Sequence, residues 1–536
     1  MEVTAPQTML HVLHELLPLQ APAALVFSSV LVIIAALLIV RRRRFGSSSD
    51  TARRARDEQL LSKLPCPPGR LPIIGHLHLV GSLPHISLRD LAAKHGGGLM
   101  LLRLGAVPTL VVSSASGAQA VLRTHDHVFA SRAYSPVTDI LFYGSTDVAF
   151  APYGEHWRQV RKIATTHLLT NRKVRSYRHA REHEVSLVIA MLRDAAGAIV
   201  DLSDLLNSFT NDVVCHAVSG KFFREGGRNR LFRELVEANS SLIGGFNLED
   251  YFPALVKMDM IKRMVCAKAR RVNAMWDQLL DKLIDDHAKN HKHTAEDTDD
   301  FIDVLLSVQH EYNLTRDHIK AQLAIMFEAG TDTSFIVLEY AMVRLMQNPR
   351  IMNKLQAEVR NNIVDKKGKT EDVVTEDEIK TLAYLKAVIK ETLRLHMPAP
   401  LLVPHLSMAD CDIEGYTIPA GTRAIVNSWA LARDPSYWED AEEFKPERFM
   451  EGGSAAAVDF KGNDFFYLPF GTGRRICPGI NFAISTTEIM LANLVHHFDW
   501  ELPLQLAEKG IDMTESFGVT VHRTQKLLLV PVVPQV

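Results

Sequence analysis

Cys477 lies in the stretch FGTGRRICPG, residues 470–479, and no other cysteine of the 536-residue chain has comparable neighbours. Three glycines surround it: Gly471, Gly473 and Gly479. Glycines allow the backbone to turn tightly and to approach a flat ligand. A thiolate binds a metal ion firmly when it is deprotonated and shielded, and nearby N–H groups and positive charge, here from Arg475, favour that form. The stretch therefore predicts a thiolate ligand in a glycine loop; the alternative is a buried structural cysteine.

A second group of polar residues lies inside an apolar segment, AIMFEAGTDTSFIVLEYAM, residues 324–342. Gly330 is a poor helix former, and Asp332 and Thr333 bring a carboxylic acid and a hydroxyl into apolar surroundings. Burial of such groups costs free energy unless they are hydrogen-bonded or used. We therefore expect a long apolar helix that is interrupted at 329–334 and carries chemistry there.

A pair of opposite charges occurs in KETLRLH, where Glu391 and Arg394 lie three residues apart and share a helix face. Downstream, Arg448 stands in FKPERF. By itself such a pair is most often an exposed ion pair on a helix surface. The spacing alone does not decide between that reading and a buried network.

Composition excludes several classes of protein. A formal net charge of −2 argues against a nucleic-acid-binding protein. The five cysteines are scattered and include no CxxC pair. This argues against a disulfide framework or a zinc site and favours a reducing, cytosol-facing compartment. The polar stretch HAKNHKHTAEDTDD, residues 287–300, is expected to be a surface loop; metal binding by its three histidines, His287, His291 and His293, is the less favoured alternative.

The N-terminal residues predict a membrane anchor. Residues 21–40, APAALVFSSVLVIIAALLIV, carry no charge and are followed by RRRR at 41–44. About twenty apolar residues can cross a bilayer as a helix, and the positive flank faces the cytosol. We expect an uncleaved signal anchor at 1–44 with its transmembrane helix at about 21–40; the alternative is a buried core helix.

The remaining residues predict one large domain behind a short connection. Residues 45–63 are polar and helix-poor at their start, which indicates a linker. The prolines of 64–75 exclude a helix there and indicate a stiff hinge. Residues 76–536 show no internal repeat, and helical periodicity dominates 155–400. Short strand-like runs stand apart from that periodicity: 99–114 and 411–427.

The stretch 470–479 matches the pattern F-x-x-G-x-R-x-C-x-G and resembles the haem-binding loop of cytochrome P-450 enzymes. The resemblance implies a mainly α fold with small β-sheets, preceded here by one transmembrane helix, and haem b bound to Cys477 as the metal ligand. It assigns eight residues to the cofactor: Trp157, Arg161, His405, Phe470, Gly473, Arg475, Cys477 and Gly479. Trp157 and Arg161 match W-x-x-x-R and would reach one haem propionate, and His405 would lie near the other.

The resemblance also implies roles for the other motifs. Glu391, Arg394 and Arg448 would form a buried ion network beneath the haem. Residues 329–334 match (A/G)-G-x-(D/E)-T-(T/S), which implies a kinked helix over the distal haem face. There the Thr333 hydroxyl would hold dioxygen, and Asp332 would relay protons for O–O cleavage. This pair favours a monooxygenase over a membrane-anchored haem sensor or carrier, which needs no proton relay.

Enzymes of this kind take electrons from a separate NADPH–cytochrome P-450 reductase, and no G-x-G-x-x-G loop occurs in the chain. Arg158, Lys162 and the basic stretch NRKVRSYRHAR, residues 171–181, are candidates for docking that acidic partner by electrostatic attraction. The alternative is a solvated basic face. Together with the anchor, the resemblance implies the endoplasmic reticulum membrane, with the catalytic domain facing the cytosol.

Several segments, FEAGTDTS and YLPFGTGRRICPGINFA among them, are most similar to the grass group of P-450 enzymes that hydroxylate indole and indolin-2-one in benzoxazinoid biosynthesis. This predicts insertion of one oxygen atom from O2 into a small apolar metabolite such as indole, indolin-2-one or a hydroxylated indolinone. The alternatives are a terpenoid, a flavonoid or a xenobiotic. Met397 stands where plant relatives usually have proline. The candidates for the substrate pocket are Phe327, Ala329, Leu401, Leu402, Val403, Phe517 and Val519.

Overall fold

The computed structural model describes residues 48–220, 228–245, 247–254, 259–290, 300–363 and 373–534. The chain forms two compact units, Met1–Ser62 and Lys63–Val536. In the first unit, α3 (Ser48–Leu61) occupies most of the segment 45–63, whose start we expected to be helix-poor. The predicted anchor at 1–44 lies outside the described residues. Among the residues that are described, no helix is both long enough and apolar enough to span a bilayer.

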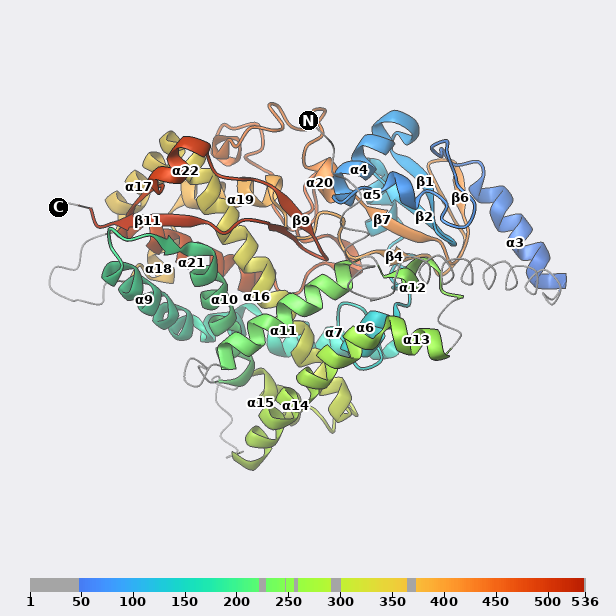
Figure 1. The fold of residues 1–536 in the computed structure, drawn as a ribbon, viewed down its shortest axis with the longest axis horizontal. Coiled ribbons are helices and arrows are strands. Elements are labelled where there is room, and N and C mark those ends of the chain that lie inside the picture. Colours follow the sequence, from blue (N-terminus) through green and yellow to red (C-terminus); the bar gives the residue numbers. More distant parts are fainter. Residues whose placement is uncertain are drawn as a thin grey trace, which may run out of the picture. The chain divides into compact units, whose positions relative to one another are not determined.

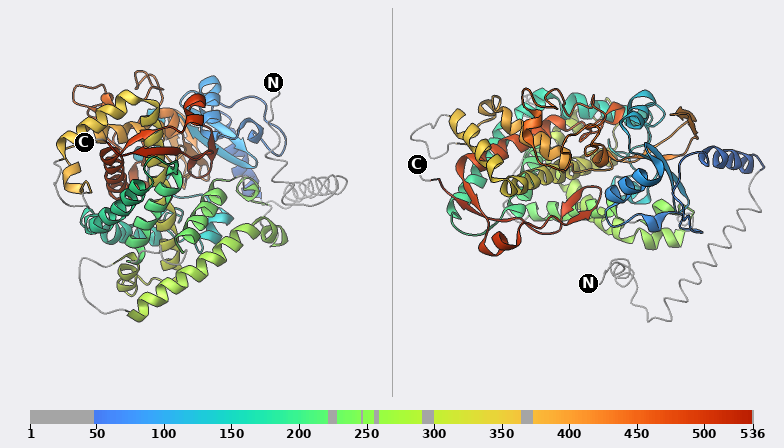
Figure 2. Two further views of the ribbon diagram at one scale, coloured as in Figure 1. Left: turned by 60° about the vertical axis from the view of Figure 1, so that its left-hand side comes forward. Right: turned by 90° about the horizontal axis from the view of Figure 1, so that it is seen from above.

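The second unit is built around α16 (Arg316–Gln347), which runs through its interior (Figures 1 and 2). Most side chains of this helix are buried, as expected for a helix enclosed by protein. The helices that pack most extensively against it, among the described residues, are α10 (Leu202–Ser219), α11 (Arg228–Gly244), α19 (Ala383–Leu395) and α21 (Ile480–His497). The remaining helices are α4 (Pro84–Leu91), α5 (Ala115–Gln119), α6 (Pro136–Leu141), α7 (Glu155–Ile163), α8 (Asn171–Ser176), α9 (Arg178–Asp194), α12 (Leu248–Tyr251), α13 (Asp259–Val265), α14 (Ala267–Asn290), α15 (Phe301–Ser307), α17 (Pro349–Asn362), α18 (Glu376–Ile379), α20 (Ser428–Leu431) and α22 (Leu504–Lys509). The predicted helical character of 155–400 is confirmed.

The expected interruption of the central helix at 329–334 is wrong, because α16 continues through these residues without a break. The Thr333 hydroxyl donates a hydrogen bond to the Ala329 carbonyl at 2.7 Å. Such a bond to the preceding turn satisfies a hydroxyl inside a helix. Gly330 marks the close approach of α16 to α10, since a Cβ at this position would lie 2.8 Å from the Val214 side chain.

The largest sheet of the described residues has the strand order β1-β2-β7-β4. Its members are β1 (Leu99–Leu104), β2 (Val107–Val112), β4 (His405–Leu406) and β7 (Arg423–Val426). Strand β2 pairs antiparallel with β1 and parallel with β7. Gly105 makes the turn between β1 and β2 with a φ of +60°, which favours glycine. The predicted strand-like runs at 99–114 and 411–427 are confirmed, and edge strand β4 carries His405.

Smaller β structures complete the described part of this unit. They are a sheet of β3 (Val200–Asp201), β11 (Leu528–Val532) and β8 (Asp499–Glu501), and the pairs β5 (Cys411–Ile413) with β6 (Tyr416–Ile418) and β9 (Glu515–Phe517) with β10 (Val521–Arg523). The β9–β10 hairpin lies against α16, where the Tyr340 hydroxyl donates to Glu515 at 2.9 Å. The proline-rich residues 64–75 contain no helix, as predicted.

A buried ion network joins α19 to the segment that leads towards Cys477. The Glu391 carboxylate accepts hydrogen bonds from Arg394 at 2.7 and 2.9 Å, and from Arg448 at 3.1 Å. All three side chains are fully or almost fully buried. The two guanidinium groups also donate to five backbone carbonyls, those of Ala432, Glu439, Asp440, Ala441 and Glu443. The three residues therefore lie together, and they fix residues 432–448 onto α19.

Aromatic packing extends this constraint to the cysteine loop. Arg394 lies over the Trp438 ring, with its Cζ atom 5.0 Å from the ring centroid. Trp438 contacts Tyr467 edge-on at 5.9 Å. The Tyr467 hydroxyl in turn donates to the Lys390 carbonyl of α19 at 2.9 Å. Because Tyr467 comes shortly before residues 470–479, α19 sets the position at which that loop begins.

His287 does not lie in the surface loop that we expected at 287–300. It is buried in the last turn of α14, with its Nε2 atom 2.9 Å from the Asp300 carboxylate. His291 and His293 lie outside the described residues. Burial disfavours the charged imidazole, but the hydrogen bond and the charge of Asp300 outweigh burial and raise the pKa of His287 to about 8.

We expect the His287–Asp300 pair to make the free energy of unfolding depend on pH. The folded-state pKa of about 8 exceeds the unfolded value of about 6.5. The pair therefore stabilises the protein fully below about pH 6.5, and up to about 2 kcal/mol is lost as the pH rises through the folded pKa. Denaturant unfolding below and above this pH window should show the loss of unfolding free energy in the wild type. The loss should be smaller in His287→Gln. An exposed-site control, His310→Gln, should match the wild type. Equal pH dependence in His287→Gln would contradict the prediction.

Candidate active site

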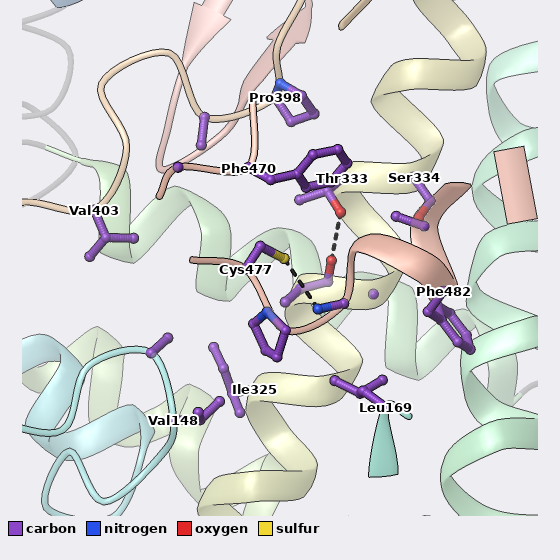
Figure 3. Close-up of a pocket in the computed structure, with 18 of the residues that line it drawn as sticks. Val148, Leu169, Ile325, Thr333, Ser334, Pro398, Val403, Phe470, Cys477 and Phe482 are labelled. Atoms are coloured by element: carbon purple, nitrogen blue, oxygen red, sulfur yellow. Dashed lines mark hydrogen bonds between the residues drawn. The ribbon is translucent and has the colours of Figure 1, made fainter. Parts of the chain in front are cut away.

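A cavity of about 280 Å³ lies within the second unit, between α16, the loop 470–479 and the start of α21. Figure 3 shows Thr333 and Ser334 on α16, Cys477 on the loop and Phe482 on α21 around this space. The residues between α19 and β4 supply another part of the wall. Elements that are far apart in the sequence thus meet around one cavity.

Cys477 lines this cavity from a loop that is closed by its own backbone. The Cys477 N–H donates to the Phe470 carbonyl at 3.0 Å, and the Gly479 N–H donates to Cys477 Sγ at 3.4 Å. Burial raises the pKa of the Cys477 thiol, although the Gly479 N–H and the charge of Arg161 act in the opposite direction. The expected N–H donor and positive charge are thus present and favour the thiolate, although the charge comes from Arg161 and burial acts against both. A cation bound at the sulfur would supply the missing stabilisation.

Gly473 is required by a neighbouring backbone. Its φ is +72°, and a Cβ at this position would lie 2.0 Å from the Leu122 carbonyl oxygen, a clash that no side-chain movement relieves. Gly479, by contrast, has room, since its Cβ would lie 3.8 Å from Cys477 Sγ. The tight turn that we expected of these glycines is therefore present at Gly473, and the Leu122 backbone gives a further reason for glycine there.

Four basic side chains line the cavity: Arg132, Arg161, His405 and Arg475. Backbone carbonyls orient three of them: Arg132, His405 and Arg475. Arg475 donates from Nε to Ala130 at 2.7 Å, and His405 donates from Nδ1 to Phe129 at 2.8 Å. Carbonyl groups position these side chains without neutralising a charge. The structure therefore brings Arg161, His405 and Arg475 together as basic groups, as expected for the acidic edge of a cofactor.

Arg132 belongs to the site and was not found from the sequence. It donates from Nη1 to the Val403 carbonyl at 2.6 Å. Burial, and then the charge of Arg475, hold the pKa of Arg132 well below its usual range, while Asp147 acts against them. In the sequence it is a lone arginine in SRAYSP, with no partner at a helical spacing, so no local signal distinguishes it.

The cavity wall carries more positive charge than its own groups neutralise. Burial lowers the pKa of Arg475 to about 9; the charge of Asp147 opposes this shift and that of Arg161 adds to it. Burial also lowers the pKa of Arg161. No carboxylate of the described residues forms an ion pair with these guanidinium groups. They therefore favour an anionic ligand, which would supply the missing counter-charge. The site therefore suits a ligand with carboxylates at one edge.

Trp157 supports this wall but does not line the cavity. Its indole N–H donates to the Val148 carbonyl at 3.0 Å, so this donor is already used. The Arg475 guanidinium stacks on the indole ring, with Cζ 4.2 Å from the centroid. The expectation that Trp157 reaches the acidic edge of the cofactor is not met, and the residue positions Arg475 instead.

Asp332 and Thr333 face different surroundings. Thr333 lines the cavity, whereas Asp332 does not. The Asp332 carboxylate is buried and accepts hydrogen bonds from Thr520 at 2.5 Å and from His522 at 3.1 Å. In this arrangement the hydroxyl alone is presented to the cavity, and the acid is held by the β9–β10 hairpin.

Three of the seven pocket candidates line the cavity: Ala329, Leu402 and Val403. The other four do not: Phe327, Leu401, Phe517 and Val519. Phe327 is fully buried and stacks on Phe232 with ring centroids 4.5 Å apart. Phe517 lies 6.0 Å from the His85 ring. The helical period explains the miss on α16, because Ile325, Ala329 and Thr333 share one face while Phe327 points to another.

A family model gives the identity that this geometry suggests: the cytochrome P450 model matches residues 65–530. The chain belongs to the cytochrome P450 family. Three maize (Zea mays) proteins are similar along almost their whole length. Indole-2-monooxygenase is 57% identical over 90% of this chain and 90% of that protein. 3-Hydroxyindolin-2-one monooxygenase is 55% identical over 88% of this chain and 89% of that protein. Indolin-2-one monooxygenase is 55% identical over 90% of this chain and 91% of that protein. A solved zebrafish cytochrome P450 with abiraterone has the same fold, with a TM-score of 0.70 and 24% identity over 85% of this chain and 100% of that chain.

This P450 is an oxidoreductase of the monooxygenase type, and its cofactor is haem. The residues present fit that group. Haem is flat, carries two carboxylates and holds a cation that binds thiolate. The cavity offers the Cys477 sulfur for the iron and the basic wall of Arg132, Arg161, Arg475 and His405 for the carboxylates. Both needs noted above, a cation at the sulfur and an anion at the guanidinium groups, are met by one ligand.

We expect Gly473→Ala to abolish most haem binding, because the added Cβ would meet the Leu122 carbonyl at 2.0 Å. The matched control is Gly452→Ala, which also has a positive φ, +79°, but no atom within 4 Å of the new Cβ. The control carries the backbone strain of about 1–2 kcal/mol without the clash. Haem content, measured from the reduced carbon-monoxide spectrum per mole of protein, should stay near the wild-type level in the control alone. Equal losses of haem in both variants would show that backbone strain, and not the contact with the Leu122 carbonyl, causes the loss.

Proposed function

We propose that this P450 hydroxylates indole, indolin-2-one or a hydroxylated indolinone as a step of benzoxazinoid biosynthesis. The observation that carries the proposal is the similarity, at 55–57% identity, to three maize enzymes named for these substrates. The three identities are nearly equal, so they do not separate the substrates. A terpenoid, a flavonoid or a xenobiotic is the alternative.

The cavity supports a small, flat and apolar substrate. Ile325 and Ala329 line it from α16, and Leu402 lines it from the segment before β4. Its few polar groups include the hydroxyls of Thr333 and Ser334. Ser334 Oγ is buried and has no hydrogen-bond partner among the described residues. Apolar walls with few polar groups select a ligand by shape and orient it by those groups.

The protein's own groups hold the reactants in this scheme. Haem, when bound, supplies the oxygen activation that no side chain of the protein provides. Cys477 would hold the iron, and the basic wall would hold the carboxylates. The Thr333 hydroxyl already donates to Ala329, so towards the cavity its oxygen is free to accept a hydrogen bond. The apolar residues of α16 and of the segment before β4 exclude water from the substrate.

We expect the full-length protein, in microsomes with a plant reductase and NADPH, to add one oxygen atom to one of indole, indolin-2-one and 3-hydroxyindolin-2-one. The preferred substrate should exceed the other two by roughly tenfold or more in kcat/KM, because a ring carbonyl or hydroxyl either pairs with or clashes with the few polar groups of the cavity. Product mass measures the outcome, and Cys477→Ala is the inactive control. No turnover of any of the three, with an intact reduced carbon-monoxide spectrum, would contradict the substrate proposal.

We also infer that the anchor holds the enzyme in the endoplasmic reticulum membrane, with the P450 domain in the cytosol. We further infer that the electrons come from NADPH through a separate flavoprotein reductase that docks at α7. Arg158 and Lys162 are exposed on α7, and Arg161 of the same helix lines the cavity. Two of the later basic residues already have acidic partners within the protein. Arg178 and Arg181 are paired with acidic side chains of α9 and α18.

Charge reversal at Arg158→Glu and Lys162→Glu should raise the apparent KM for the reductase several-fold, more so at low ionic strength, because electrostatic attraction steers the encounter. Reductase titrations at constant haem content measure the effect. Lys282→Glu, an exposed charge reversal on α14, is the matched control and should leave the KM unchanged. If all three variants behave alike, docking at α7 is ruled out.

A further inference from the structure

The Asp332 carboxylate belongs to a buried polar cluster beside α16 and outside the cavity. Its Oδ2 atom accepts hydrogen bonds from Thr520 at 2.5 Å, from His522 at 3.1 Å and from Ser240 at 3.4 Å. The Thr520 hydroxyl also lies 2.9 Å from that of Ser240 and 3.1 Å from His522 Nε2. Three elements therefore meet at one carboxylate: α16, α11 and the β9–β10 hairpin with its turn.

His522 is the member of this cluster that water reaches. Its side chain is 29% exposed, against 6% for Asp332, and Ser240 and Thr520 are both buried. The Nε2 atom of His522 is the one directed at the carboxylate. An imidazole can accept a proton from water on one nitrogen and give one up from the other. The ring thus connects a buried acid to solvent.

The charges around His522 favour its protonated form. Asp332 and Glu339 act on it from α16, and Glu237 acts on it from α11. Arg523, its neighbour on β10, is itself paired with Glu339 at 3.5 Å. Burial lowers the pKa of His522, but the charge and hydrogen bond of Asp332, together with the two glutamates, outweigh burial and raise that pKa.

Glu328, one turn earlier on α16, does not compete for the imidazole. Burial raises the pKa of Glu328 well above its usual range, and the charge of Asp332 raises it further. Burial and the neighbouring carboxylate thus both disfavour a charge on Glu328. Of these two acids of α16, Asp332 is the one hydrogen-bonded to the imidazole.

The hairpin holds His522 in a fixed position. The N–H of Val521 donates to the Pro398 carbonyl on the cavity wall at 2.9 Å. At the tip, Gly244 of α11 lies so close that a Cβ there would be 1.8 Å from the carbonyl carbon of Gly518. Backbone contacts on both sides therefore leave the imidazole little freedom to move away from the carboxylate.

We propose that His522 holds Asp332 in place and supplies it with protons during turnover, an inference that rests on the monooxygenase function above. Insertion of one atom of O2 into a substrate reduces the other atom to water, which consumes a pair of protons and the pair of electrons that the reductase delivers. In each transfer the Nε2–H bond of His522 breaks, an O–H bond forms at Asp332 Oδ2, and the imidazole regains a proton from water. The new O–H bond breaks when Asp332 passes the proton on to the oxygen atom that is reduced to water. Thr520 orients the carboxylate and is not a source of protons.

The purified holoenzyme with reductase and NADPH tests this role in His522→Gln. Glutamine keeps an N–H donor towards Asp332 but cannot supply a proton near neutral pH. Peroxide released per NADPH should therefore rise roughly three- to tenfold, at unchanged KM. In the wild type, product per NADPH should fall as the pH rises through the raised pKa of His522, and in His522→Gln it should be low and independent of pH. His179→Gln, at an exposed histidine of α9, is the matched control.

A double-mutant cycle of thermal midpoints with His522→Phe and Asp332→Asn tests the pairing without turnover. The double variant should lose less than the sum of the single losses, and additive losses would overturn the inference. Wild-type product yield and pH profile in His522→Gln would also overturn it. If none of the three indole substrates is turned over, the substrate proposal is overturned instead. The double-mutant cycle would then still show whether His522 and Asp332 interact.

Discussion

The Glu391 carboxylate is the group on which the rest of this P450 depends. It is fully buried, and the two arginines that hold it also bind five carbonyls of residues 432–448. Removal of one partner from such a pair leaves a buried charge uncompensated, which costs about 3–5 kcal/mol, a large share of the stability of a typical domain. Because Trp438 and Tyr467 extend these contacts to the start of the loop, an ion network outside the cavity sets the position of Cys477.

The cavity itself shows one physical effect with two opposite consequences. Burial disfavours charge, so it raises the pKa of the Cys477 thiol and lowers the pKa of the Arg475 guanidinium. A ligand that brings a cation to the sulfur and carboxylates to the arginines reverses both. The protein therefore folds around a site whose electrostatics are complete only with haem bound. Backbone carbonyls of Phe129, Ala130 and Val403 hold the basic groups ready without cancelling their charge.

Helix α16 separates two different environments. Successive residues of an α-helix point about 100° apart, so Thr333 faces the cavity while Asp332 joins the polar cluster of α11 and the hairpin. Strand β10 of the hairpin also touches the cavity wall through Val521 and Pro398. One helix thus lies between the cavity and the water-accessible acid cluster. Because the hairpin contacts both, a change in its position would affect both.

Local sequence determined the parts of this protein whose chemistry lies within a few residues. The glycines and arginine around Cys477, the helical period of 155–400 and the strand runs near 99 and 411 indicated the family, the fold class and the iron ligand. Tertiary structure alone decided which side chains meet. It added Arg132 to the basic wall, turned Asp332 towards His522, used the Trp157 N–H within the protein and placed Phe327 in the core. The reason is that the direction of a side chain depends on the phase and packing of its helix, and its partners come from segments up to hundreds of residues away.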